Sequence, residues 1–295
     1  MPAYKTNVQI GHVTTEGDTL YFEVRGQGDP LLMISPGGGD ADHFMQIADI
    51  LSDEFKVITY DRRGNARSTG NYPQNFEISQ QSRDAAAILR AAGETSAYVL
   101  GNSSGANIAL DLAKTQPHAC RAVIPHEPPV PGILPESKKW SRFFASVYKT
   151  GCGIGGPNLA ALRFIMGIQE PVKQLSKAHK QSDEYAKDQR IQPDQPRISN
   201  TDAVNVLIKN ELLPVTNYLP DTDRIMKNGV NLFIGMGSWA SGNKTWLGRT
   251  AMILADRLGC EMVTFPGHHG SFMDMPEKWS SVLRDVLHRA QKKNS

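Results

Sequence analysis

Cysteine is scarce in this sequence, and its three residues form no recognisable set. Cys120, Cys152 and Cys260 are an odd number, lie far apart and include no Cys-x-x-Cys pair. A disulfide framework needs an even set at regular spacings, and a structural zinc site needs closely spaced ligand pairs. The sequence therefore predicts neither a disulfide framework nor a metal site. A cytoplasmic enzyme with reduced thiols is expected.

A charge excess and long apolar runs are also missing. The 32 Lys and Arg residues nearly balance the 30 Asp and Glu residues, which leaves a net charge of +2 and predicts no nucleic-acid partner. No run approaches the roughly 18 apolar residues that cross a membrane, and the first residues lack the apolar stretch of a secretory signal. We expect no membrane partner and a small-molecule substrate, with the protein a monomer or a homodimer.

What the sequence does contain is an alternation of short apolar runs with segments of helical period. Strands are predicted at 18–25, 31–35, 56–60, 98–100, 122–124, 230–234 and 261–265, and helices at 78–92, 244–258 and 277–288. Short apolar runs bounded by turn residues are typical of strands that are buried on both faces. The pattern predicts an α/β fold with a mostly parallel sheet and helices on both faces.

The alternation stops in the middle of the chain. Five prolines fall within 125–135, glycines cluster at 151–157, and the stretch that follows has helical patches but no convincing strand. We therefore predict a helical cap, or lid, over residues 131–222. It would be inserted into an α/β core made of residues 1–130 and 223–295.

One pentapeptide carries the strongest chemical signal. Gly101-Asn102-Ser103-Ser104-Gly105 follows a predicted strand and precedes a predicted helix. In that context a G-x-S-x-G sequence makes a sharp, strained turn that exposes the serine hydroxyl, with the positive helix N-terminus beside it. Ser103 is thus predicted as a nucleophile. The alternative is a glycine-rich turn of a doubly wound sheet.

A second glycine-rich turn follows the early strand at 31–35. Ser35-Pro36-Gly37-Gly38-Gly39 can present free backbone N–H groups, and an acyl-transfer site needs two such donors near the oxyanion. We predict the amides of Gly38 and Ser104 as these donors. A phosphate-binding loop is the alternative, but no Lys followed by Ser or Thr closes the turn as a P-loop requires.

A serine nucleophile needs an adjacent base, and histidine is the usual one. His269 directly follows the last predicted strand, at the sheet edge where Ser103 is expected, and His268 is the close competitor. Structural or surface roles are expected for the histidines that fall in helices, turns or the tail, namely His12, His43, His118, His179 and His288.

In this order, the glycine turn, the serine elbow, the helical insertion and the histidine loop resemble the α/β-hydrolase superfamily across nearly the whole chain. The turn at 61–68, Asp-Arg-Arg-Gly-Asn-Ala-Arg-Ser, adds to the resemblance and is expected to be structural. The resemblance implies an eight-stranded sheet with a cap and no cofactor. The family's Pro-Gly-Gly-His-x-Gly pattern implies that His269, and not His268, is the base.

The third member of a catalytic triad departs from the family pattern. Members usually carry this acid just after the seventh strand, but residues 235–239 read Gly-Met-Gly-Ser-Trp and the next carboxylate is Asp256. Glu127 ends the sixth strand, where a minority of the family, including zearalenone lactonases, places the acid. We predict Glu127 as the acid that holds the His269 tautomer. Asp40, a cap residue, or no acid at all are the alternatives.

These residues predict a serine hydrolase of the carboxylic ester or lactone class, acting on a fairly apolar small molecule through an acyl-enzyme. Trp140, Phe144 and Tyr148 of the cap are candidate substrate contacts. The same scaffold also hosts C–C cleavage, isomerisation and cofactor-free peroxidase-like chemistry, and it hosts ligand receptors. An epoxide or haloalkane hydrolase is disfavoured, because those enzymes resemble this family but use Asp at the position of Ser103.

Overall fold

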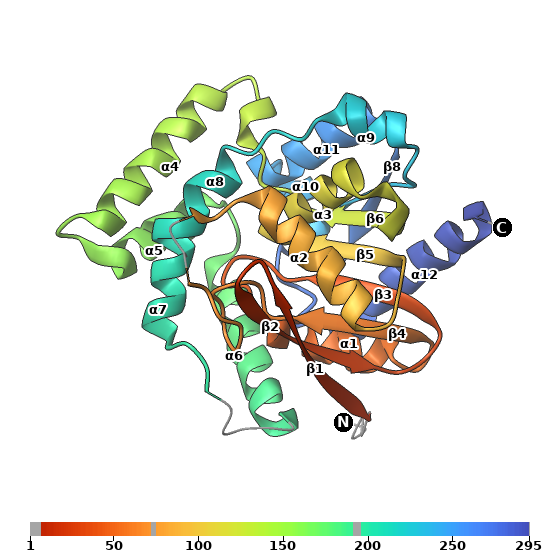
Figure 1. Ribbon diagram of the computed structural model, residues 1–295. Coiled ribbons are helices and arrows are strands. Elements are labelled where there is room, and N and C mark those ends of the chain that lie inside the picture. The colour runs from red at the N-terminus through yellow and green to blue at the C-terminus, as the bar shows by residue number, and fades with distance from the viewer. Residues whose placement is uncertain (1–6, 72–74, 191–195, 295) are drawn as a thin grey trace.

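The computed structural model describes residues 7–71, 75–190 and 196–294, and a single sheet runs through it (Figure 1). The sheet has eight strands in the order β1-β2-β4-β3-β5-β6-β7-β8. They are β1 (Val8–Thr15), β2 (Asp18–Arg25), β3 (Asp29–Ile34), β4 (Phe55–Tyr60), β5 (Ala97–Asn102), β6 (Cys120–His126), β7 (Phe233–Gly237) and β8 (Glu261–Phe265). Only the pairs β1–β2 and β2–β4 are antiparallel. The predicted mostly parallel sheet is confirmed.

Helices cover both faces of this sheet, as predicted. Along β3, Leu32 and Ile34 belong to one buried cluster and Leu31 and Met33 to the other, because successive strand side chains point to opposite faces. The first cluster includes residues of α2 (Ile78–Ala91), α3 (Ser104–Thr115), α9 (Thr222–Asn228) and α11 (Trp246–Leu258). The second includes residues of α1 (Met45–Leu51) and α12 (Pro276–Asn294).

Between β6 and β7 the described residues form helices and no strand. They are η4 (Pro131–Ile133), α4 (Ser137–Cys152), α5 (Gly156–Gly167), α6 (Val172–Gln189), α7 (Asn200–Asn205), the π-helix η5 (Val206–Glu211), α8 (Leu212–Thr216) and α9. Figure 1 shows α4 to α8 grouped at one side of the sheet, and we refer to residues 131–222 as the lid. Within the described ranges, no helix is both long and apolar enough to cross a membrane.

The predicted strand at 230–234 was wrong in its position. The strand β7 begins at Phe233, and Leu232 makes only an isolated bridge to Val123. Its far end, Gly235-Met236-Gly237, has the composition of a loop but pairs with β8 as far as Phe265. Pairing with neighbouring strands therefore decided the strand limits, and the local apolar run did not.

Candidate active site

Ser103 lies in a sharp turn between β5 and α3. Its backbone has φ 54° and ψ −121°, a conformation that costs a non-glycine residue about 1–3 kcal/mol. The flanking glycines are required by space: a Cβ at Gly101 would lie 2.2 Å from the Gly105 carbonyl oxygen, and one at Gly105 would lie 2.1 Å from that of Ile34. The tight strand-to-helix turn expected from the pentapeptide is therefore present. It packs directly on the end of β3.

The glycine turn after β3 lies beside this elbow. The N–H of Gly39 donates to the carbonyl of Pro36 at 3.0 Å, and Gly38 has φ 89°, which favours glycine. A Cβ at Gly37 would lie 2.7 Å from Cδ1 of Leu207, so the lid touches this turn. Ser104 is the first residue of α3, where an amide has no intrahelical acceptor. The role of the Gly38 and Ser104 amides as oxyanion donors remains a prediction.

Glu127 and His269 are in direct contact. A distance of 2.5 Å joins Oε2 of Glu127 to Nδ1 of His269, which leaves Nε2 at the opposite end of the ring. The carboxylate is fully buried, and its other oxygen accepts the N–H of Gly237 at 2.8 Å. Glu127 has φ 48°, an uncommon backbone for a non-glycine residue. The acid and the base predicted from sequence are therefore brought together.

Charge and burial act on this pair in opposite directions. Burial alone would raise the pKa of Glu127, but the hydrogen bond from His269 and the nearby imidazoles outweigh it and hold that pKa below its usual value. Burial alone would lower the pKa of His269, but the hydrogen bond and charge of Glu127, with the charge of Glu170, raise it. The arrangement therefore stabilises an imidazolium at His269, which is what a general base requires after it accepts a proton.

The neighbouring His268 has other partners. Its Nδ1 accepts the N–H of Gly270 at 3.1 Å, and its Nε2 lies 3.3 Å from a carboxylate oxygen of Asp274. Of the two adjacent histidines, only His269 forms a hydrogen bond with Glu127. In the described residues no hydrogen bond joins the Ser103 hydroxyl to the His269 ring. Such contacts are often long in enzymes without substrate.

The side chains of Asn102 and His126 form a hydrogen bond next to the Ser103 turn. The side-chain amide of Asn102 donates to Nδ1 of His126 at 2.7 Å and to the carbonyl of His269 at 3.3 Å. Burial lowers the pKa of His126 to about 4, so its ring is neutral at pH 7 and Nδ1 can accept. Ligand atoms of His126, Glu127 and His269 lie within 4.8 Å of one another. A metal held by Oε2 of Glu127 and Nδ1 of His269 would displace the hydrogen bond between these two atoms.

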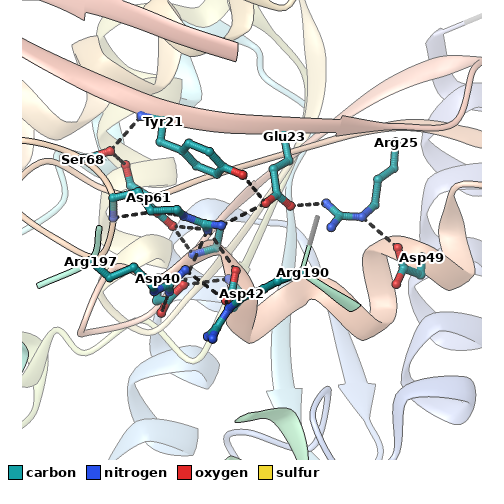
Figure 2. A network of polar contacts seen from close by, with 12 residues as sticks. Tyr21, Glu23, Arg25, Asp40, Asp42, Asp49, Asp61, Ser68, Arg190 and Arg197 are labelled. Carbon is teal, nitrogen blue, oxygen red and sulfur yellow. Dashed lines mark hydrogen bonds and ion pairs between the residues drawn. The ribbon is translucent and has the colours of Figure 1, made fainter. Parts of the chain in front are cut away.

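A buried network of charges lies behind the glycine turn (Figure 2). Asp61 is fully buried and accepts the N–H of Ala41 at 2.8 Å and Nε of Arg67 at 2.5 Å. Arg67 also donates to Asp42 at 2.9 Å and to Glu23 at 3.0 Å. These contacts fix the start of the helical turn that follows Gly39. The structural role expected for the turn at 61–68 agrees with them.

The lid reaches this network through two arginines. Figure 2 shows Arg190 and Arg197 beside Asp40 and Asp42. Nε of Arg190 lies 2.8 Å from Asp42, and Arg197 pairs with Asp40 and with Asp42. Asp40, an alternative for the triad acid, is therefore held by a lid arginine. Arg190 and Arg197 therefore attach the lid to the loop that presents Gly38.

Arg62 was not singled out by the sequence, although it lies within the turn at 61–68. It is fully buried, and its Nη2 donates to the carbonyl of Pro36 and to the carboxylate of Glu211, both at 2.8 Å. It thereby links the glycine turn to η5 of the lid. Its place directly after Asp61 in this turn was the only signal for it in the sequence.

The aromatic residues proposed as substrate contacts pack largely within the lid. Trp140 and Phe144 are buried and belong to a cluster that includes Trp246 of α11, with ring centroids 5.1 and 5.6 Å from that indole. Tyr148 packs at the edge of the same cluster. Their contact with a substrate remains a prediction.

A hollow of about 720 Å³ lies at the other end of the strands from Ser103, beside their amino ends. It is lined by the starts of β5 and β6 and by the chain before β7, including Tyr98, Cys120 and Val230. Ser103, Glu127 and His269 all follow the carboxyl ends of strands. In open α/β sheets ligands bind at the carboxyl ends of the strands. The region around Ser103 is therefore a better candidate for the ligand site than this hollow.

Comparison with known proteins agrees with this geometry. Residues 29–149 match the family model described as alpha/beta hydrolase fold. The chain is similar to an uncharacterized hydrolase, YraK, of Bacillus subtilis, with 28% identity over 97% of this chain and 98% of the relative. Its fold is similar to an enol-lactonase from Burkholderia xenovorans (TM-score 0.70, 14% identity, 94% of this chain and 100% of that one). It is also similar to a thermophilic esterase from Thermogutta terrifontis (TM-score 0.70, 20% identity, 96% and 99%). These similarities show that the chain has the α/β-hydrolase fold.

Proposed function

We propose that this protein is a cofactor-independent serine hydrolase that cleaves an ester or lactone of a fairly apolar small molecule. The observation that carries the proposal is the 2.5 Å contact between Glu127 and His269, set beside a strained Ser103 at the start of α3. A buried carboxylate on Nδ1 fixes the tautomer in which Nε2 is free to accept a proton. The names of the two similar solved structures, an enol-lactonase and an esterase, support the substrate class.

The reaction follows from these positions. His269 takes the hydroxyl proton of Ser103 as the serine oxygen bonds to the substrate carbonyl carbon. The amides of Gly38 and Ser104 hold the oxygen that becomes negative. His269 then gives its proton to the departing alkoxide, the C–O bond breaks, and an acyl-enzyme and an alcohol result. Water attacks the acyl-enzyme with His269 again as base, and Ser103 is released with the acid.

The lid at 131–222 forms the roof of the site in this proposal. Leu207 against Gly37 and Glu211 against Arg62 place lid residues next to the glycine turn. A roof of this kind limits the substrate to a small molecule and keeps water from the acyl-enzyme until the alcohol has left. Trp140, Phe144 and Tyr148 would shape its apolar side.

A fluorophosphonate probe tests the proposal. We expect mass spectrometry to find the label on Ser103, and we expect turnover of p-nitrophenyl esters or of lactones. Absence of a label would favour a receptor on the same scaffold. Labelling without any ester or lactone hydrolysis would favour non-hydrolytic chemistry, such as C–C cleavage.

A further inference from the structure

A second carboxylate reaches the proposed base from the lid. Glu170 lies in the loop between α5 and α6 and is only 6% exposed. Its Oε2 accepts the backbone N–H of His269 at 3.0 Å. Its Oε1 is buried, and no hydrogen-bond partner for it occurs in the described residues. Burying a carboxylate with only one oxygen hydrogen-bonded costs folding free energy, which indicates that Glu170 has a function that offsets this cost.

The loop that carries Glu170 is docked on the chain after β7. The carbonyl of Gln169 accepts Nε1–H of Trp239 at 3.3 Å, and its side-chain oxygen accepts the N–H of Trp246 at 3.0 Å. Gln169 has φ 62°, which is uncommon for a residue with a side chain. The position of Glu170 therefore depends on the seating of the lid against the core.

The charges around Glu170 act in both directions. Burial and the charge of Glu127 raise the pKa of Glu170 to about 7, while His269 works against the shift. In return, the charge of Glu170 raises the pKa of His269. The other imidazoles around His269 are those of His126, His179 and His268, and burial lowers the pKa of each, so they add no positive charge at neutral pH.

We propose that Glu170 is a positioning residue for His269, supplied by the lid. Its carboxylate holds the main chain of the histidine in place and, when ionised, adds a second negative charge that stabilises the imidazolium. The inference rests on the proposed function, in which His269 is the base. It follows that the base is complete only when the loop at 167–171 is seated on the core.

Two substitutions separate the two roles. Glu170→Gln keeps an oxygen acceptor for the His269 N–H but removes the charge, whereas Glu170→Ala removes both. The matched control is Glu184→Gln, since Glu184 is an exposed carboxylate of α6. The assay is the pH dependence of kcat and kcat/KM with p-nitrophenyl butyrate as probe.

For Glu170→Gln we expect the acid limb of kcat/KM to move down by roughly one pH unit, because a nearby negative charge is lost. For Glu170→Ala we expect a further fall in kcat of about tenfold with little change in KM, the effect of losing one buried acceptor. Glu184→Gln should behave as wild type. If both Glu170 variants kept the wild-type pH profile of kcat/KM and the wild-type kcat, the inference would be overturned.

Titration of the His269 ring by NMR provides a readout that needs no turnover. In protein labelled at histidine, the resonance lost in His269→Ala identifies the ring, and its titration midpoint should be lower in Glu170→Gln than in wild type. An identical midpoint would refute the role of Glu170, even if Ser103 takes a fluorophosphonate label. If Ser103 takes no label but the midpoint moves, the proposed hydrolase function fails and the coupling between Glu170 and His269 stands.

Discussion

The carboxylate of Glu127 accepts the backbone N–H of Gly237 at 2.8 Å, although Glu127 follows β6 and Gly237 is the last residue of β7. The backbone of Glu127 leaves β6, but its side chain ends beside the last residue of β7. Family members usually place the triad acid after the seventh strand, and here a longer side chain from the sixth reaches the same region. This relationship explains how a chain with no carboxylate at 235–239 can still present one to His269.

Ser103→Ala should fold normally and lose at least about 10³-fold in kcat on any ester or lactone substrate, because the nucleophile is gone. Circular dichroism and urea unfolding would check the fold. Ser176→Ala, on the exposed face of α6, is the control and should be fully active. Full turnover by Ser103→Ala would end the serine-hydrolase proposal.

The two adjacent histidines should differ sharply. His269→Ala should match the loss in Ser103→Ala, since it removes the base that contacts Glu127. His268→Ala should be much milder, because His268 meets Asp274 instead. Steady-state kinetics on one substrate suffices. If His268→Ala proved the more damaging variant, His268 would be the base.

Glu127→Gln should cost about 10⁴ in kcat, the loss expected when the base is no longer held in its working tautomer. The amide oxygen still accepts the N–H of Gly237, so the free energy of unfolding should change far less than activity does. Asp256→Asn is the matched control, since Asp256 lies exposed on α11. Equal activity in the two variants would point to a dyad of Ser103 and His269.

Gly237→Ala tests the space that the acid needs. An added Cβ would lie 2.9 Å from the carbonyl oxygen of Gly267 and 3.2 Å from Oε1 of Glu127, so the carboxylate must move. A displacement of about 1 Å can cost about 10²-fold in rate, and we expect a loss of that size. Gly242→Ala, where an added Cβ meets open space, should be silent. Comparable rates for the two variants would show that activity does not depend on the exact position of the Glu127 carboxylate.

His126 should make stability depend on pH. Its pKa in the folded protein is about 4, below the value of 6.5 for a free histidine, so the unfolded chain binds the additional proton. Stability is therefore fully present above about pH 6.5 and is lost as pH falls toward 4, by about 2 kcal/mol between pH 7 and pH 5. Urea unfolding at the two pH values measures this. His126→Gln should remove that part of the dependence, whatever its effect on absolute stability, and an unchanged pH dependence would contradict the assignment.

Most of the fold could be predicted because its signals are local. Apolar runs bounded by turns mark the strands, and G-x-S-x-G marks the elbow by the steric needs of Gly101 and Gly105. Two strands are exceptions: β1 (Val8–Thr15) was not predicted, and the end of β7 at Gly235-Met236-Gly237 has no β-favouring side chain. Pairing with β8 makes it a strand, and such pairing is not visible in a local pattern.

The site was predictable in part. Ser103, Glu127 and His269 each come shortly after a predicted strand, so a parallel sheet brings them to the carboxyl ends of its strands. The family resemblance then favoured His269 over His268 as base and Glu127 as acid. Glu170 and Arg62 could not be found in this way. Glu170 contacts His269, which lies 99 positions away in the sequence, and Arg62 contacts Glu211, which lies 149 positions away. Both contacts depend on how the lid packs on the core, which no short motif records.

Two of the attachments between the lid and the core differ in chemistry. Around Asp40 and Asp42 the attachment is ionic, through Arg190 and Arg197, and around Trp246 it is a cluster of apolar rings. Dissolved sulfate screens partly exposed ion pairs, and it strengthens apolar association. Raising its concentration therefore weakens one attachment while tightening the other.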